Sequence, residues 1–143
     1  MGLYSCRGQS SKTFVHEAVV EYLRRGRPLS VLFAGDWDPT GRSVPRSVVE
    51  RMERYGNGGL ELDFRQIAVT ADDVRSGRFT THDVNTADAN YRRYREECLR
   101  EDIDPHLAVE VEALDPGLLR RRLESAIEAL IDDIDGWNAL YAA

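Results

Sequence analysis

The chain has 143 residues, of which 42% are hydrophobic and 31% are charged, and its formal net charge at pH 7 is −6. This length is typical of one domain, so we expect residues 1–143 to share a single core. The acidic balance argues against a protein that holds nucleic acid by overall positive charge. The apolar runs are too short to cross a membrane, and we expect a cytoplasmic protein.

The first half of the chain alternates between strand and helix patterns. Residues 3–6 can form a short strand, and the serines that follow can cap a helix over residues 12–25. Residues 29–34 are a continuous apolar run between chain-breaking residues, which is typical of a strand buried in a parallel sheet. A helix that begins near Ser43 and ends at the glycine-rich residues 56–59 follows.

The second half continues the same alternation. Residues 60–69 begin with alternating apolar and charged side chains and end in an apolar run, which predicts a strand. Thr70 can cap a short helical turn, and a charged helix is expected over residues 87–100. A further strand is expected at residues 107–111. The last helix begins at Asp115, which is followed by proline at the first helical position.

This order of elements predicts an α/β fold. We expect a mostly parallel four-stranded sheet flanked by helices on both faces, in a Rossmann-like arrangement. In such sheets, ligands bind beyond the carboxyl ends of the strands. The segment LFAGDWDPTG, residues 32–41, comes at such an end and is the first candidate for a functional site.

Two carboxylates, Asp36 and Asp38, follow the apolar strand one residue apart. Like charges this close repel, and a bound Mg²⁺ ion, which prefers oxygen ligands, would relieve the repulsion. The backbone N–H groups at the start of the next helix favour an anion such as phosphate, so Gly41 and the adjacent Arg42 are the predicted phosphate contacts. The alternative interpretation is that the aspartates only form turns, as aspartates in loops commonly do.

Three segments of this sequence resemble a known family. They are YSCRGQSSKTFVHEA at residues 4–18, LFAGDWDPTG at 32–41 and VEVEALDPGLLRRRLESAI at 109–127. The chain resembles the Toprim domains of topoisomerases, primases and related nucleases, most closely the type found in the A subunit of topoisomerase VI and in related phage proteins. The resemblance implies that Asp36 and Asp38 bind Mg²⁺ and support phosphoryl transfer at a phosphodiester of nucleic acid, with DNA as the expected partner.

One departure from the family pattern affects the expected activity. Toprim domains carry a glutamate at the end of an earlier strand, and the chain begins after the position expected for that strand, while Glu17 and Glu21 lie on a predicted helix. The topoisomerase relatives also use a tyrosine nucleophile on a separate domain. Three explanations of the missing glutamate therefore remain: the chain is a fragment of a larger protein, a partner subunit supplies the missing groups, or the module has lost catalysis.

Two other functions fit parts of the sequence. DWDPT matches the DxDxT signature of haloacid-dehalogenase-type phosphatases, in which Asp36 would be the nucleophile and Asp38 the general acid/base. Asp132 and Asp133 could serve as the later acidic pair of that family, but the lysine expected between the two motifs is missing, because Lys12 lies upstream of both. A non-catalytic module that binds nucleic acid or protein is the other alternative.

The segment at residues 82–88 contains further candidate ligands. His82, Asp83 and Asp88 can extend the metal site or contact the substrate. Aspartate and threonine are also common helix caps, and we favour the interpretation that Thr86 or Asp88 caps the helix that follows.

Overall fold

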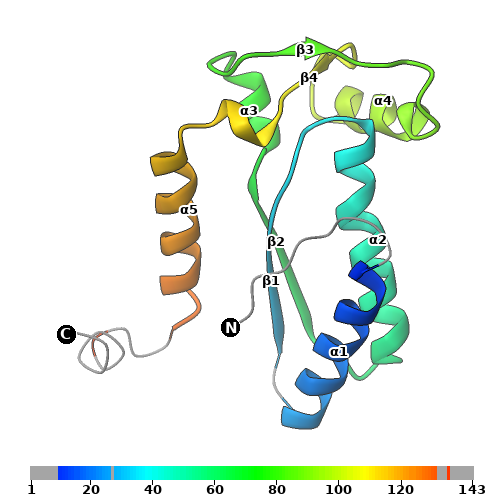
Figure 1. The fold of residues 1–143 in the computed structure, drawn as a ribbon, viewed down its shortest axis with the longest axis vertical. Coiled ribbons are helices and arrows are strands. Elements are labelled where there is room, and N and C mark those ends of the chain that lie inside the picture. The colour runs from blue at the N-terminus through cyan, green and yellow to red at the C-terminus, as the bar shows by residue number, and fades with distance from the viewer. Residues whose placement is uncertain (1–9, 27, 132–134, 136–143) are drawn as a thin grey trace.

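The computed structural model describes residues 10–26, 28–131 and 135, and over these residues the protein is a mixed α/β structure (Figure 1). Its elements are α1 (Ser10–Arg25), β1 (Leu29–Ala34), α2 (Pro39–Gly56), β2 (Leu62–Ala68), α3 (Ala71–Arg75), β3 (His82–Asp83), α4 (Tyr91–Arg100), β4 (Leu107–Ala108), the 3₁₀ turn η1 (Val111–Ala113) and α5 (Pro116–Glu128). No helix in these ranges is both long enough and apolar enough to cross a membrane.

The parallel sheet is smaller than expected. β1 and β2 pair in parallel, with Leu29 opposite Leu62, and they form a two-stranded sheet within the described ranges. The prediction of a four-stranded parallel sheet is therefore wrong for this part of the chain. The strand expected at residues 107–111 is reduced to β4, which pairs antiparallel with β3, and the strand expected at residues 3–6 lies outside the described residues.

The path of the chain after β2 explains this difference. A parallel neighbour requires a connection that returns along the whole length of the sheet. Instead, α3, β3 and α4 gather at the end of the sheet where β1 and β2 finish (Figure 1). The chain therefore re-enters β4 from that end, in the opposite direction to β1.

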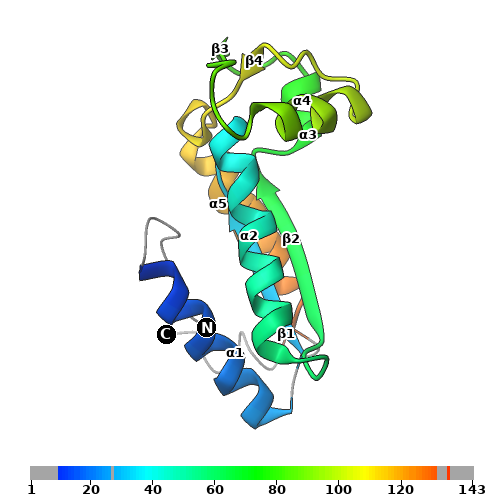
Figure 2. The same ribbon diagram turned by 90° about the vertical axis from the view of Figure 1, so that its right-hand side faces the viewer.

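Helices cover both faces of the sheet, as the sequence predicts. α1 and α2 pack together on one face, and α5 lies on the other (Figure 2). The first face is held by a cluster of apolar side chains that become buried because α1 and α2 each present one apolar stripe to the sheet. Its buried members are Val15, Val19, Leu29, Val48 and Met52.

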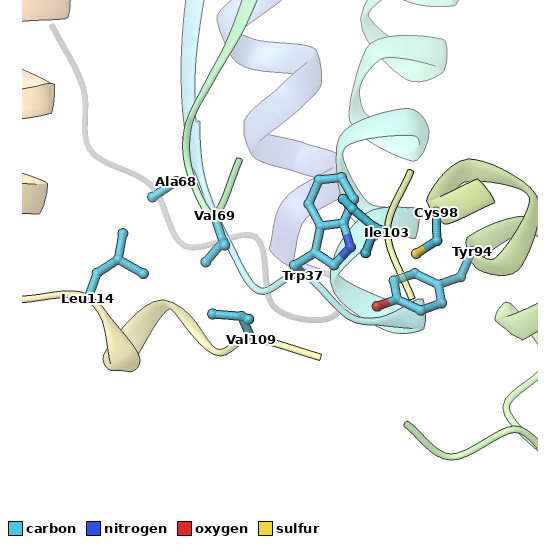
Figure 3. Packing of buried hydrophobic residues seen from close by; sticks show 8 residues of the cluster. All are labelled: Trp37, Ala68, Val69, Tyr94, Cys98, Ile103, Val109 and Leu114. Atoms are coloured by element: carbon cyan, nitrogen blue, oxygen red, sulfur yellow. The ribbon is translucent and has the colours of Figure 1, made fainter. Parts of the chain in front are cut away.

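A second buried cluster lies at the carboxyl end of the strands, where β1 and β2 meet α4 and the segment that leads into α5. Figure 3 shows that its side chains surround the turn that follows β1. The cluster consists of Trp37, Ala68, Val69, Tyr94, Cys98, Ile103, Val109 and Leu114. Packing of Trp37 against α4 in this cluster therefore stabilises the end of the sheet where ligands are expected.

α2 begins earlier than the sequence predicts. Asp38 is its N-cap and Pro39 is its first residue, whereas Ser43 lies inside the helix and donates to the carbonyl of Thr40. Aspartate is among the best N-cap residues, and proline at the first helical position is already fixed in helical φ. The predicted start at Ser43 is therefore wrong, and the helix begins directly at the acidic turn.

The caps of the shorter helices follow the sequence closely. Thr70 caps α3 in a capping box with Asp73, and Asp115 caps α5 with a proline in its first turn, which confirms both predictions. α4 begins at Tyr91 instead of residue 87. The preceding residues form turns in which the Asp88 side chain accepts from the backbone N–H of Asn90.

Candidate functional site

The acidic turn leaves the sheet between two neighbouring segments. On one side, Gly35 donates to the carbonyl of Ala68 at 2.8 Å and accepts from the N–H of Val69 at 2.7 Å. On the other side, Trp37 and Val109 exchange two backbone hydrogen bonds of 2.8 and 3.1 Å. The tip of β1 thus has a hydrogen-bonded partner on both sides, and the turn is fixed at the carboxyl end of the strands.

Each carboxylate of the turn is held through one oxygen. Asp36 accepts from the N–H of Val111 at 2.8 Å, and Asp38 accepts from the N–H of Gly41 as the cap of α2. Within the described part of the chain, the second oxygen of each side chain makes no hydrogen bond, and both side chains are partly exposed. The arrangement therefore orients both aspartates and leaves one oxygen of each for a ligand.

Gly41 lets the first turn of α2 lie directly against the acidic turn. A Cβ atom at this position would lie 3.0 Å from both the Asp36 carbonyl carbon and Asp38 Oδ1, and closer still to the carbonyl oxygen of Asp36. These neighbours include backbone atoms, which cannot move aside as the end of a flexible side chain can. Glycine is therefore required here by close approach.

We expect Gly41→Ala to lower the free energy of unfolding by about 1–3 kcal/mol, because the added methyl group must push the backbone of Asp36 away from α2. Urea denaturation followed by circular dichroism measures the change. Gly59→Ala is the matched control, since a Cβ there approaches its nearest neighbour only to 3.4 Å. Equal loss of stability in the two variants would contradict the requirement for close approach at Gly41.

A cavity of about 1180 Å³ runs along β1 and is bordered by α1, α2, α5 and η1. Both aspartates of the turn line it, together with Thr40 and Gly41 at the start of α2. The charged side chains that face this space are mostly acidic, with Arg25, which pairs with Glu21, as the basic member of the lining. A lining in which negative charge predominates favours cationic ligands. The acidic residues that line it are Glu17, Glu21, Asp36, Asp38 and Glu112.

Arg42, a predicted phosphate contact, is engaged inside the protein. Its Nε and Nη2 donate to Glu97 Oε1 at 3.0 and 2.6 Å, and Nη1 donates to Gln66. Its guanidinium carbon lies 4.6 Å from the centre of the Trp37 ring. The N–H of Gly41, the other predicted contact, donates to Asp38. Contact of these two residues with phosphate stays a prediction.

The structure brings one residue of the 82–88 segment to the acidic turn. Thr40 Oγ1 donates to Asp88 Oδ2 at 3.1 Å, and the hydrogen bond from the N–H of Asn90 lowers the pKa of Asp88. His82 and Asp83 are exposed on β3. The cap of α4 is Asn90, so the prediction that Thr86 or Asp88 is its N-cap is wrong.

No three side chains of His, Cys, Asp or Glu converge as a metal-binding group within the described ranges. A Mg²⁺ ion at Asp36 and Asp38 would therefore complete its shell with water, substrate oxygens or ligands from outside these ranges, as Mg²⁺ commonly does. Asp132 and Asp133, the acidic pair of the phosphatase alternative, lie outside the described residues.

Sequence reasoning missed two features of this site: the backbone N–H of Val111, which holds Asp36, and the approach of Asp88 to Thr40. Neither has a local signal, because the partners are far apart in the chain. Comparison with family models, with curated proteins and with solved structures finds no match for this chain.

Proposed function

We propose that the chain is a Toprim-like domain that binds Mg²⁺ through Asp36 and Asp38 and acts on phosphodiester bonds of nucleic acid, with DNA as its substrate. One observation carries the proposal. Both carboxylates leave the tip of β1, each is oriented by a backbone N–H through one oxygen, and both line the same acidic cavity.

Mg²⁺ would supply two things at this turn. When bound by Asp36 and Asp38, it would neutralise these neighbouring carboxylates and would act as a Lewis acid toward a phosphate group. The chain itself carries a net charge of −6, which repels a nucleic-acid backbone. A divalent cation held by Asp36 and Asp38 would therefore help an acidic protein to bind a phosphate group.

A complete reaction requires groups beyond the two aspartates. Tyr94 is unsuited to act as a nucleophile, because it is 1% exposed, its hydroxyl donates to the carbonyl of Leu107 and burial raises its pKa. We propose that a partner subunit or a further domain supplies the additional carboxylate and the nucleophile.

A Mg²⁺ titration followed by ¹H–¹⁵N NMR tests the metal site. We expect chemical-shift changes that saturate at millimolar Mg²⁺ and centre on Asp36, Asp38 and Gly41, because these residues surround the open carboxylate oxygens. Asp36→Asn should weaken binding by about tenfold or more, since it removes one of two charged ligands. Asp83→Asn, on the exposed strand β3, is the matched control and should leave binding unchanged.

Three outcomes separate the candidate functions. Absence of shifts at the turn would overturn the metal site and favour a non-catalytic interaction module. Release of phosphate from an aryl phosphate that disappears in Asp36→Asn would favour the phosphatase alternative. Cleavage of DNA by the chain together with its partner, lost in the same variant, is the result that the Toprim-like proposal expects.

A further inference from the structure

An internal network links Arg42 to the acidic turn, and we infer that Arg42, Gln66 and Glu97 are positioning residues for the metal site. The inference rests on the proposed function, because it concerns Mg²⁺ bound by Asp36 and Asp38. It changes the role that the sequence suggests for Arg42, from contact with phosphate to support of the two carboxylates.

The network joins three elements at one guanidinium. Arg42 lies on α2, and it pairs with Glu97 on α4 and with Gln66 on β2. The side chains of Arg42 and Glu97 are only 15% and 16% exposed. Gln66 in turn donates to the carbonyl of Val69 at 2.7 Å, just beyond the end of β2. The guanidinium is thus fixed relative to both the sheet and α4.

Arg42 is connected to the turn by two contacts, one made by its guanidinium and one by its backbone. The guanidinium lies over the ring of Trp37, the residue between the two aspartates, with 4.6 Å between its carbon and the ring centre. The backbone N–H of Arg42 also donates to the carbonyl of Asp38 at 2.9 Å. Trp37 is 2% exposed, and the guanidinium of Arg42 forms part of the packing around its indole.

Two buried polar atoms beside the network lack a hydrogen-bond partner in the described part of the chain: Trp37 Nε1 and Glu97 Oε2. Unpaired buried polar atoms destabilise a fold, and an apolar replacement of a buried ion pair is often neutral or stabilising. The unpaired atoms lower the contribution of this network to stability. We therefore infer that the network serves to position the acidic turn more than to stabilise the fold.

Geometry matters here because Mg²⁺ demands a nearly regular octahedron with oxygens about 2.1 Å away. Asp36 and Asp38 can meet this demand only if the backbone of Trp37, the residue between them, is held in one conformation. The guanidinium of Arg42 packs on the Trp37 side chain and so restricts its movement. Loosening the network should therefore weaken Mg²⁺ binding even though none of its side chains touches the metal.

Arg42→Met is a useful test because the loss of charge and the loss of positioning should change the affinity for Mg²⁺ in opposite directions. Removing a positive charge near a cation site should by itself tighten Mg²⁺ binding. Loss of positioning should weaken it, and we expect the dissociation constant from the NMR titration to rise about tenfold, as for other residues that orient metal ligands. Arg46→Met, one turn further along α2, makes the same charge change and should leave binding unchanged or slightly tighter.

Three further variants separate loss of positioning from loss of charge and from loss of stability. Arg42→Lys keeps the charge but loses the planar fork, so it should weaken binding as Arg42→Met does. Val19→Ala lowers stability from the other core cluster and should leave the dissociation constant unchanged in the folded protein. Glu97→Gln completes the set with a substitution of nearly the same shape, and it should also weaken binding.

The outcomes separate this inference from the proposed function. If the wild-type chain shows no Mg²⁺-dependent shifts at the turn, the metal site and the positioning role both fall. If the wild type binds Mg²⁺ and Asp36→Asn abolishes binding, but Arg42→Met and Arg42→Lys bind as tightly as the wild type or more tightly, only the positioning role is overturned.

Discussion

Replacing Arg122 by methionine is expected to lower the free energy of unfolding by about 3–5 kcal/mol, because it leaves the carboxylate of Asp73 buried without its partner. The two side chains form a pair of hydrogen bonds of 2.5 and 2.7 Å between α5 and α3, and Asp73 is 3% exposed. Arg122 also donates to the carbonyl of Ile67 at 3.1 Å, which ties α5 to β2. Urea denaturation at neutral pH measures the loss.

The pH dependence identifies the cause of that loss. Burial alone would raise the pKa of Asp73, but the hydrogen bonds from Arg122 and Thr70 outweigh it and lower the pKa overall. A lowered folded-state pKa stabilises the protein above the unfolded value of about 4, and this contribution disappears as the pH falls through the folded-state pKa. The difference between wild type and Arg122→Met should therefore shrink in acid.

Arg120→Met is the control for this pair, because it breaks an exposed ion pair with Glu124 on the same helix. Exposed pairs contribute little, so this variant should leave the free energy of unfolding nearly unchanged. A loss of stability in Arg122→Met that is as small as in the control, or that stays constant down to low pH, would show that the Asp73 pair does not hold α5 to the sheet.

Replacing Trp37 by alanine is expected to cost about 3–5 kcal/mol, because it empties the centre of the cluster beneath the acidic turn. The side chain is 2% exposed and lies between α4 and the segment around Val109 (Figure 3). Its loss also removes the ring on which Arg42 rests. Thermal and urea denaturation, followed by circular dichroism, give the change in stability.

Trp37→Phe sharpens this prediction. Trp37 Nε1 makes no hydrogen bond of normal geometry within the described residues, and its polar neighbour is the thiol of Cys98, so phenylalanine removes ring volume and this weak contact. We expect it to lower stability by clearly less than alanine does, because most of the buried ring is kept. Equal destabilisation by phenylalanine and alanine would contradict the claim that the volume of the buried ring, and not the contact of the indole N–H with Cys98, stabilises this cluster.

The sequence was most informative where the interacting groups lie close together in the chain. The cap of α3 at Thr70, the cap of α5 at Asp115 and the apolar strand β1 each depend on residues within one or two turns of each other. The same holds for the aspartates that follow β1, whose proximity to each other needs no tertiary contact. Local steric and hydrogen-bonding preferences were sufficient for these features.

The sequence by itself thus determined that two carboxylates follow an apolar strand, whereas the structure showed that the second of them, Asp38, caps α2. The tertiary structure decided what holds them: Val111 lies 75 residues from Asp36, and Glu97 lies 55 residues from Arg42. It also decided the direction of β4, because the path of the chain from β2, and not the pattern of residues 107–111, sets which strand it meets. Such contacts form only when distant segments are packed together, and short-range patterns do not encode them.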